Sequence, residues 1–157
     1  MRRALVIAAG GAAFVLLATA NSGGYRYGVS DQAYYQPAIV HALEPATFPR
    51  DRALLATQSR FLISDQAVAG LVAMSGGDIE RVFLIVYVVG LLGLFGAALA
   101  FSRAMRFTPL TTAVLMLLLT FRHRIARTGA NSLEGYLHMR TLAFAVGVAA
   151  LAAIASG

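Results

Sequence analysis

Carboxylate, imidazole and phenol side chains gather in one stretch of the chain, residues 28–51, which reads GVSDQAYYQPAIVHALEPATFPRD. Three of the four prolines also lie there, whereas an ordinary flexible linker would be rich in Gly and Ser. A carboxylate such as Asp31 or Asp51 can act as a general base when it lies beside a reacting hydroxyl group. Each of the two can instead cap the helix that follows it. Residue type alone leaves both roles open.

Arginines supply a second kind of chemistry. All 13 basic residues are arginines against 7 acids, and a guanidinium group can bind phosphate oxygens with two parallel hydrogen bonds. Candidates for holding a lipid phosphate, with anchoring among lipid headgroups as the alternative, are Arg26, Arg122, Arg124, Arg127 and Arg140. Arg140 and Glu134 are favoured because they stand beside an apolar run, where the wall of a membrane cavity would be. The arginines mostly flank apolar runs, so we expect no nucleic-acid partner.

The remaining polar residues exclude several kinds of site. Tyr34 could offer a platform for a sugar ring, or it could belong to an aromatic belt at the membrane surface. The three histidines have neither H-x-x-x-H nor H-E-x-x-H spacing, so the sequence predicts no metal site of that kind. The chain has no cysteine, which excludes disulfides and thiol catalysis. It also lacks a nucleophile elbow, a P-loop and a dinucleotide fingerprint.

Four apolar runs must position these side chains. Hydrophobic residues make up 59% of the 157 residues and the mean hydropathy is +0.71, which predicts an all-α polytopic integral membrane protein. The predicted spans, within a single membrane domain, are residues 4–20, 82–101, 107–121 and 141–155. The third run gives only about 22 Å of helix, so it either crosses a thinned bilayer or is re-entrant. Gly90 and Gly93 belong to a small-residue surface on the second run that a neighbouring helix can approach closely.

Charge predicts the orientation of the first run. Arg2 and Arg3 precede it, so the N-terminus is expected in the cytoplasm and residues 21–81 on the external side. Residues 18–20 have the A-x-A form of a signal-peptide cleavage site, and removal of residues 1–20 is the alternative. The fourth run meets residue 157 without a flanking charge, so we expect the chain to be a fragment of a longer protein.

The external segment, residues 21–81, is predicted to hold short helices that lie along the membrane surface. The expected helices are residues 32–43, with Pro37 in or near the first turn, residues 52–63, amphipathic through Leu54, Leu55, Gln58, Phe61 and Leu62, and residues 67–74. Residues 64–67 repeat the tetrapeptide SDQA of residues 30–33. Two helix N-caps of similar composition explain this repeat better than duplication does.

Three short motifs carry a resemblance to a known family. They are residues 28–33 (GVSDQA), 48–51 (FPRD) and 133–143 (LEGYLHMRTLA). The chain also has a first membrane helix, then a long external loop with an early acidic residue, then two lateral helices before the second span. In this arrangement the chain resembles the N-terminal module of GT-C fold glycosyltransferases, most closely uncharacterised bacterial GT-C-like membrane proteins. Those enzymes are multi-span proteins that use sugars attached to lipid phosphate.

The resemblance implies a function and a site. It implies the front part of an enzyme that moves a sugar from a lipid-linked donor on the extracytoplasmic side of a bacterial inner membrane, with further membrane helices in the same protein or in a partner subunit. Asp31 matches the acid of the first external loop, a catalytic base or metal ligand in that fold, so a divalent metal is compatible with it. The resemblance also places residues 122–140 outside, as the second external segment. The alternative is a non-catalytic membrane scaffold or partner subunit.

Overall fold

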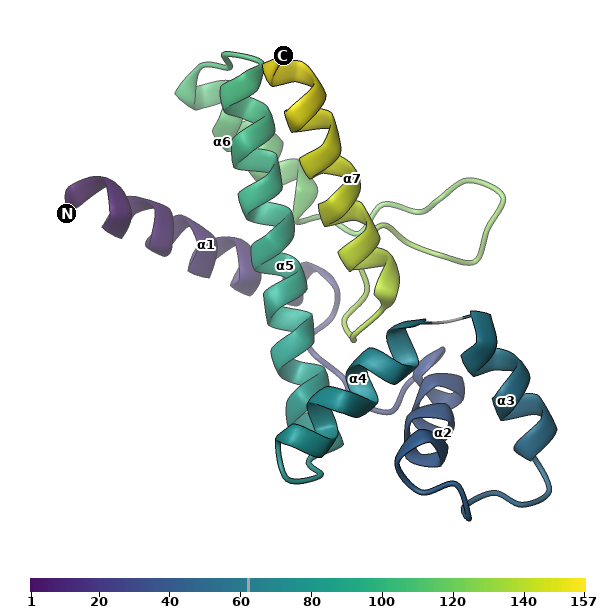
Figure 1. Ribbon diagram of the computed structural model, residues 1–157. Helices are drawn as coiled ribbons and strands as arrows, with labels where there is room; N and C mark the ends of the chain where they lie inside the picture. Colours follow the sequence, from purple (N-terminus) through teal and green to yellow (C-terminus); the bar gives the residue numbers. More distant parts are fainter. Residues whose placement is uncertain (62) are drawn as a thin grey trace. The chain divides into compact units, whose positions relative to one another are not determined.

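The computed structural model describes residues 1–61 and 63–157, and within these ranges the chain is all-helical, with no strand. The helices are α1 (Arg2–Asn21), α2 (Gln32–Leu43), α3 (Arg52–Phe61), α4 (Ile63–Met74), α5 (Ile79–Ala104), α6 (Pro109–Leu119) and α7 (Met139–Ser156) (Figure 1). Helices α1, α5 and α7 are each long and apolar enough to cross a membrane, as an integral membrane protein requires, whereas α6 is a shorter apolar helix.

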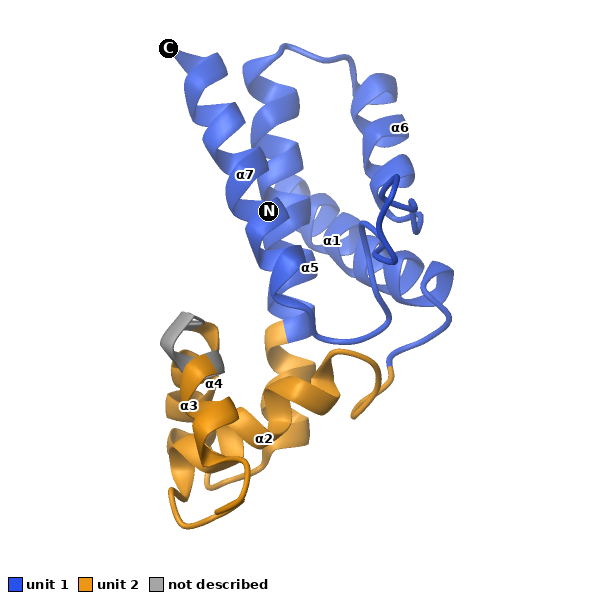
Figure 2. Cartoon of the chain, turned by 90° about the vertical axis from the view of Figure 1, so that its right-hand side faces the viewer, with its two compact units in different colours: residues 1–25, 87–157 blue, residues 26–86 orange. Residues whose placement is uncertain are grey.

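Two compact units make up the chain (Figure 2). Unit 1 comprises residues 1–25 and 87–157, and unit 2 comprises residues 26–86. Unit 2 therefore contains α2, α3 and α4 together with the first turns of α5, and unit 1 contains the rest of α5 and the other apolar helices.

Helices α5 and α7 lie side by side in unit 1 and run in the same direction (Figures 1 and 2). A Cβ atom added at Gly90 would lie 3.1 Å from Leu142 Cδ2, and one added at Gly93 would lie 3.7 Å from Ala145 Cβ. The glycines thus form the surface on which α7 packs, the role proposed for them from the sequence. Both contacts join residues 52 positions apart (90 with 142, 93 with 145).

This register fixes which parts of unit 1 share an end. The offset places Tyr87 level with Met139 and Ala104 level with Ser156, so residues 105–138 must return from the C-terminal end of α5 to the N-terminal end of α7. Helix α6 lies on this return path; its 11 residues give about 16 Å of helix. Thr108 caps it, because its side chain accepts a hydrogen bond of 3.1 Å from the Thr111 amide.

We call the end of unit 1 near Tyr87 the loop end. Tyr87 O–H lies 3.0 Å from Thr19 Oγ1, and its ring packs against Tyr25 with the centroids 5.1 Å apart. Asn21 Nδ2 donates to Thr120 Oγ1 at 3.1 Å, which joins the C-terminal ends of α1 and α6. The chain therefore leaves unit 1 after Tyr25 and re-enters it at Tyr87 at the same end.

Helices α2, α3 and α4 pack on one another in unit 2 around a small apolar core. The buried side chains include Ile39, Leu55, Val68, Val72 and Phe83. Helix α2 occupies the predicted residues, and it begins at Gln32, whose buried Oε1 accepts a hydrogen bond of 2.7 Å from the Gly28 amide. Asp78 caps α5, since its Oδ1 accepts from the Arg81 amide at 2.9 Å.

Two local predictions in unit 2 are wrong. Pro37 lies inside α2, as the sixth residue of the helix, and not in its first turn. Helix α4 begins at Ile63, four residues before the predicted start, so residues 64–67 lie within it and do not precede it. Asp65 in its first turn is favourable near the positive end of the helix dipole, and it is buried. Leu62, assigned to an amphipathic face, lies outside the described residues.

Candidate functional site

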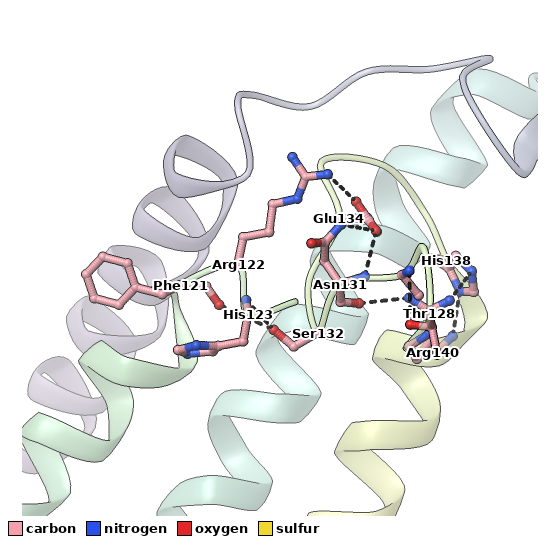
Figure 3. A network of polar contacts seen from close by, with 10 residues as sticks. Phe121, Arg122, His123, Thr128, Asn131, Ser132, Glu134, His138 and Arg140 are labelled. Carbon is pink, nitrogen blue, oxygen red and sulfur yellow. Dashed lines mark hydrogen bonds and ion pairs between the residues drawn. The ribbon is translucent and has the colours of Figure 1, made fainter. Parts of the chain in front are cut away.

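Glu134 lies at the centre of a polar network at the loop end of unit 1 (Figure 3). Its Oε1 accepts hydrogen bonds from the Asn131 backbone amide at 3.2 Å and from Asn131 Nδ2 at 2.9 Å. Its Oε2 lies 3.5 Å from Arg122 Nη2, and the Glu134 side chain is only 10% exposed while that of Arg122 is 45% exposed. The carboxylate is thus largely occupied by this chain's own donors, and Arg122 keeps donors that face solvent.

Arg140 joins the same network through Asn131. Its Nη1 donates to the Asn131 carbonyl oxygen at 2.8 Å, and its Nη2 lies 3.2 Å from His138 Nε2. His138 caps α7, because its Nδ1 accepts a hydrogen bond of 3.0 Å from the Arg140 amide. Glu134 and Arg140, the two residues favoured from the sequence, therefore belong to one network, but they are bridged by Asn131 and not paired with each other.

A short hairpin holds this network in place. His123 N donates to Ser132 Oγ at 2.9 Å, Ser132 N donates to the His123 carbonyl at 2.7 Å, and Arg124 pairs with Asn131 in an isolated bridge. Leu133 and Leu137, in the segment that follows the hairpin, are buried. Arg127, near its tip, is exposed and has a left-handed backbone conformation with φ of 61°.

Removal of the Glu134 carboxylate should loosen this hairpin. Glu134→Ala leaves the Asn131 donors without their acceptor, and we expect it to cost about 2 kcal/mol of local stability. Hydrogen exchange of residues 121–138 should then accelerate roughly 10-fold or more, as measured by mass spectrometry. Glu134→Gln is the control, because it keeps an acceptor for Asn131 and removes only the half-exposed ion pair with Arg122, a contact of small value. Equal protection in the wild type and the alanine variant would contradict the central role of Glu134.

Asp51 and Tyr34 share a pocket in unit 2. The cavity has a volume of about 200 Å³ and is lined by Ala33, Tyr34, Pro37, Phe48, Asp51, Leu54 and Leu55. Asp51 directly precedes α3, as predicted, and is exposed, and Tyr34 on α2 is 66% exposed. An exposed carboxylate beside an exposed aromatic ring is a combination that can receive a sugar, since the ring covers an apolar sugar face and the carboxylate accepts from hydroxyl groups.

Asp31 lies at the N-cap position of α2, one turn before Tyr34. Its backbone is helical, with φ of −62° and ψ of −18°, and its side chain makes no capping hydrogen bond. The alternative role assigned from the sequence, a helix cap, therefore lacks the contact that would define it. Asp31 is half-buried and does not line the pocket of Tyr34 and Asp51.

Tyr27 gives unit 2 a further polar group next to acids. Burial raises the pKa of Tyr27 above its usual value of 10, and the nearby carboxylates of Glu80 and Asp78 raise this pKa further. The phenol therefore stays protonated at physiological pH. Its ring packs edge-on against Phe83, with the centroids 5.6 Å apart. The adjacent Arg26 is exposed and forms no ion pair with any residue that the structure describes.

The predicted site residues thus fall into two groups, one in each unit. Tyr34 and Asp51 share a pocket in unit 2, which also contains Asp31 and Arg26, while Glu134 and Arg140 share a network in unit 1. No group of three or more histidine and acidic residues in the described ranges is arranged to hold a metal ion.

Sequence reasoning missed three residues near these groups. Asn131 was assigned only to a turn, although it joins Glu134 to Arg140. Gly135 is buried against the backbone of residues 22–24, and Asp65 is buried in unit 2. Only Asp65 had a signal in the sequence, because the repeated SDQA tetrapeptide drew attention to it. No family model, curated protein or solved structure matches this chain.

Proposed function

We propose that the chain is the N-terminal part of a GT-C-like membrane glycosyltransferase, which moves a sugar from a lipid-phosphate donor on the extracytoplasmic side of a bacterial inner membrane. In this proposal residues 107–121 cross the bilayer as a short fourth span. Residues 21–81 and 122–140 are external, and the short helices of residues 32–74 lie along the membrane surface. Further membrane helices come from the same longer protein or from a partner subunit.

One observation carries the proposal: both segments with candidate site residues emerge from the loop end of unit 1. Tyr25 and Tyr87, where residues 26–86 leave and re-enter this unit, are in ring contact. The backbone at Gly135 packs against Ser22 and Gly24, which brings residues 121–138 to the same end. Arg103 lies in the last turn of α5 and Arg106 follows it, at the opposite end of unit 1, as expected for the cytoplasmic side.

The proposed roles follow from the chemistry of each group. Asp31 is the general base that deprotonates the acceptor hydroxyl, and Asp51 and Tyr34 bind a sugar in their pocket. Arg122, with donors left over beside Glu134, is suited to a lipid phosphate, whereas Arg140 orders the loop by holding Asn131. One observation supports the alternative function, a non-catalytic scaffold: Glu134 and Arg140 are already occupied by contacts within the chain.

Cysteine accessibility tests the topology on which the proposal depends. The chain has no cysteine, so single replacements give no background. We expect Ala46→Cys and Ala126→Cys to react with a membrane-impermeant maleimide in intact cells. Met105→Cys, at the other end of unit 1, should react only after permeabilisation. All three positions are exposed. Labelling of Ala46→Cys without Ala126→Cys would make residues 107–121 re-entrant and place residues 122–140 on the cytoplasmic side.

A further inference from the structure

An apolar groove lies between α1, α5 and α6 in unit 1. Its volume is about 640 Å³, and its lining includes Val6, Phe14, Phe95, Phe107, Pro109 and Met116. Helices α1 and α6 meet at their C-terminal ends, where Asn21 donates to Thr120, and they diverge toward their N-terminal ends (Figures 1 and 2). The groove is therefore closed near the loop end and open toward the opposite end, which we call the arginine end.

Three arginines lie within one turn of residues that line the groove. Arg106 directly precedes Phe107, which lines the groove, and Arg103 lies in the last turn of α5. Arg3 lies one turn before Val6 and Ile7 on the groove-lining face of α1. The three are exposed, and none forms an ion pair with a described residue. No acidic residue occurs between positions 81 and 133, so this positive charge is locally uncompensated.

Arg106 occupies a backbone position that favours glycine. Helix α5 ends in a Schellman motif, in which Phe107 N donates to the Ser102 carbonyl at 2.9 Å and Arg106 N donates to the Arg103 carbonyl at 3.0 Å. Arg106 has the left-handed φ of 55° that this motif requires at its position. An arginine is less stable there than glycine, and strain of this kind tends to occur at functional positions.

The depth of the groove matches one leaflet of a bilayer. Along α5 it extends past Leu99 to Phe95, and eight residues of helix place Phe95 about 12 Å from Arg103. Half of the hydrocarbon core is about 15 Å. A protein helix as long as α6, about 10 Å across and 16 Å long, would need roughly twice the volume of the groove. A single flexible chain is the occupant that fits this space.

We propose that the groove holds one acyl chain of an anionic phospholipid, whose phosphate is bound by Arg106 at the groove mouth. Arg103, in the last turn of α5, adds positive charge nearby, and guanidinium donors match phosphate oxygens. The site lies at the arginine end, opposite the proposed sugar-transfer site, and it does not depend on that function. Anionic lipids are concentrated in the cytoplasmic leaflet, the side expected for these arginines.

Native mass spectrometry of the purified chain with phosphatidylglycerol or phosphatidylcholine tests the headgroup. The wild type should retain one phosphatidylglycerol at concentrations where it retains no phosphatidylcholine. Arg106→Gly should retain about fivefold less, the factor for one arginine near an anionic surface. Its melting temperature in lipid-free detergent should be unchanged or higher, since glycine suits the backbone, and this separates lost binding from misfolding. Arg50→Gly is the control for loss of an exposed arginine: Arg50 does not line the groove, and retention should stay unchanged.

A second variant tests the acyl chain. Ala113 lines the groove from α6 and is exposed, so Ala113→Phe should fill the groove and displace the lipid without any change of charge. Equal retention of the two lipids by the wild type would overturn the proposal. So would undiminished phosphatidylglycerol binding by Arg106→Gly or by Ala113→Phe. A lipid-free dimer that Ala113→Phe converts to a monomer would assign the groove to a second copy of the chain instead.

Discussion

Asp31→Asn should lower the rate of sugar transfer about 10²–10⁴-fold per folded molecule, the range for loss of a general base. The measurement uses membranes that contain the complete transfer machinery and a radiolabelled lipid-linked sugar. Asparagine keeps the size of the side chain and removes the charge. Asparagine also keeps much of the hydrogen-bonding and capping capacity of the side chain, so the substitution should change the melting temperature only slightly. The rate and the stability therefore report on different roles.

Asp51→Asn provides the comparison within the same unit. Asp51 lines the pocket with Tyr34, so its loss should weaken sugar binding and raise KM about tenfold, with a smaller effect on kcat. If Asp31→Asn retains transfer within roughly tenfold of the wild type, below the range for a lost base, the catalytic role of Asp31 is refuted. If both variants transfer sugar at the wild-type rate, the scaffold function is the better explanation.

Gly135→Ala should be the most destabilising single substitution in the loop of residues 121–138. The added Cβ would meet two backbone carbonyl oxygens, those of Gly24 and Ser22, the second at 2.9 Å. Backbone atoms cannot swing aside as a flexible side chain can, so the loop and the end of α1 must separate. We expect a cost of about 3 kcal/mol, the upper part of the range for overpacking. The melting temperature in detergent should fall by about 10 °C.

Gly129→Ala is the matched control for this substitution. Gly129 lies in the same loop, and a Cβ added there would meet nothing within 4 Å. Its melting temperature should stay close to that of the wild type. Equal melting temperatures for Gly135→Ala and Gly129→Ala would show that residues 22–24 and Gly135 are not in close contact in the membrane-embedded protein.

Local sequence signals predicted those elements whose limits depend on nearby residues. Glu44-Pro45 ends α2 and Asp51 precedes α3, since proline and capping residues act over a few positions. The start of α4 could not be predicted in this way. Ser64 and Asp65 read as a cap, but Asp65 is buried and the helix extends past it to Ile63, so packing within unit 2 overrides the local preference.

The sequence could predict the candidate site only where the site residues are close to one another along the chain. Glu134 and Arg140 are six positions apart, and their position before an apolar run placed them in one region. The bridging role of Asn131 depends on the course of the hairpin, which the turn residues 128–132 indicate only in part. The contact of Gly135 with Gly24 joins residues far apart in the sequence, and no periodicity or composition encodes such a pair. The pocket of Tyr34 and Asp51 likewise exists only because α2 packs on α3.

The parallel arrangement of α5 and α7 has a consequence for biogenesis. Two adjacent parallel helices cannot form a hairpin, so the contact of Gly90 with Leu142 must wait until the ribosome has synthesised the whole of residues 105–142. During that interval α6, with 11 residues, is too short for stable insertion by itself, and α5 exposes its glycine surface to lipid. We therefore expect assembly of unit 1 to be post-insertional, and newly made chains to depend on a membrane insertase or chaperone until α7 closes the bundle.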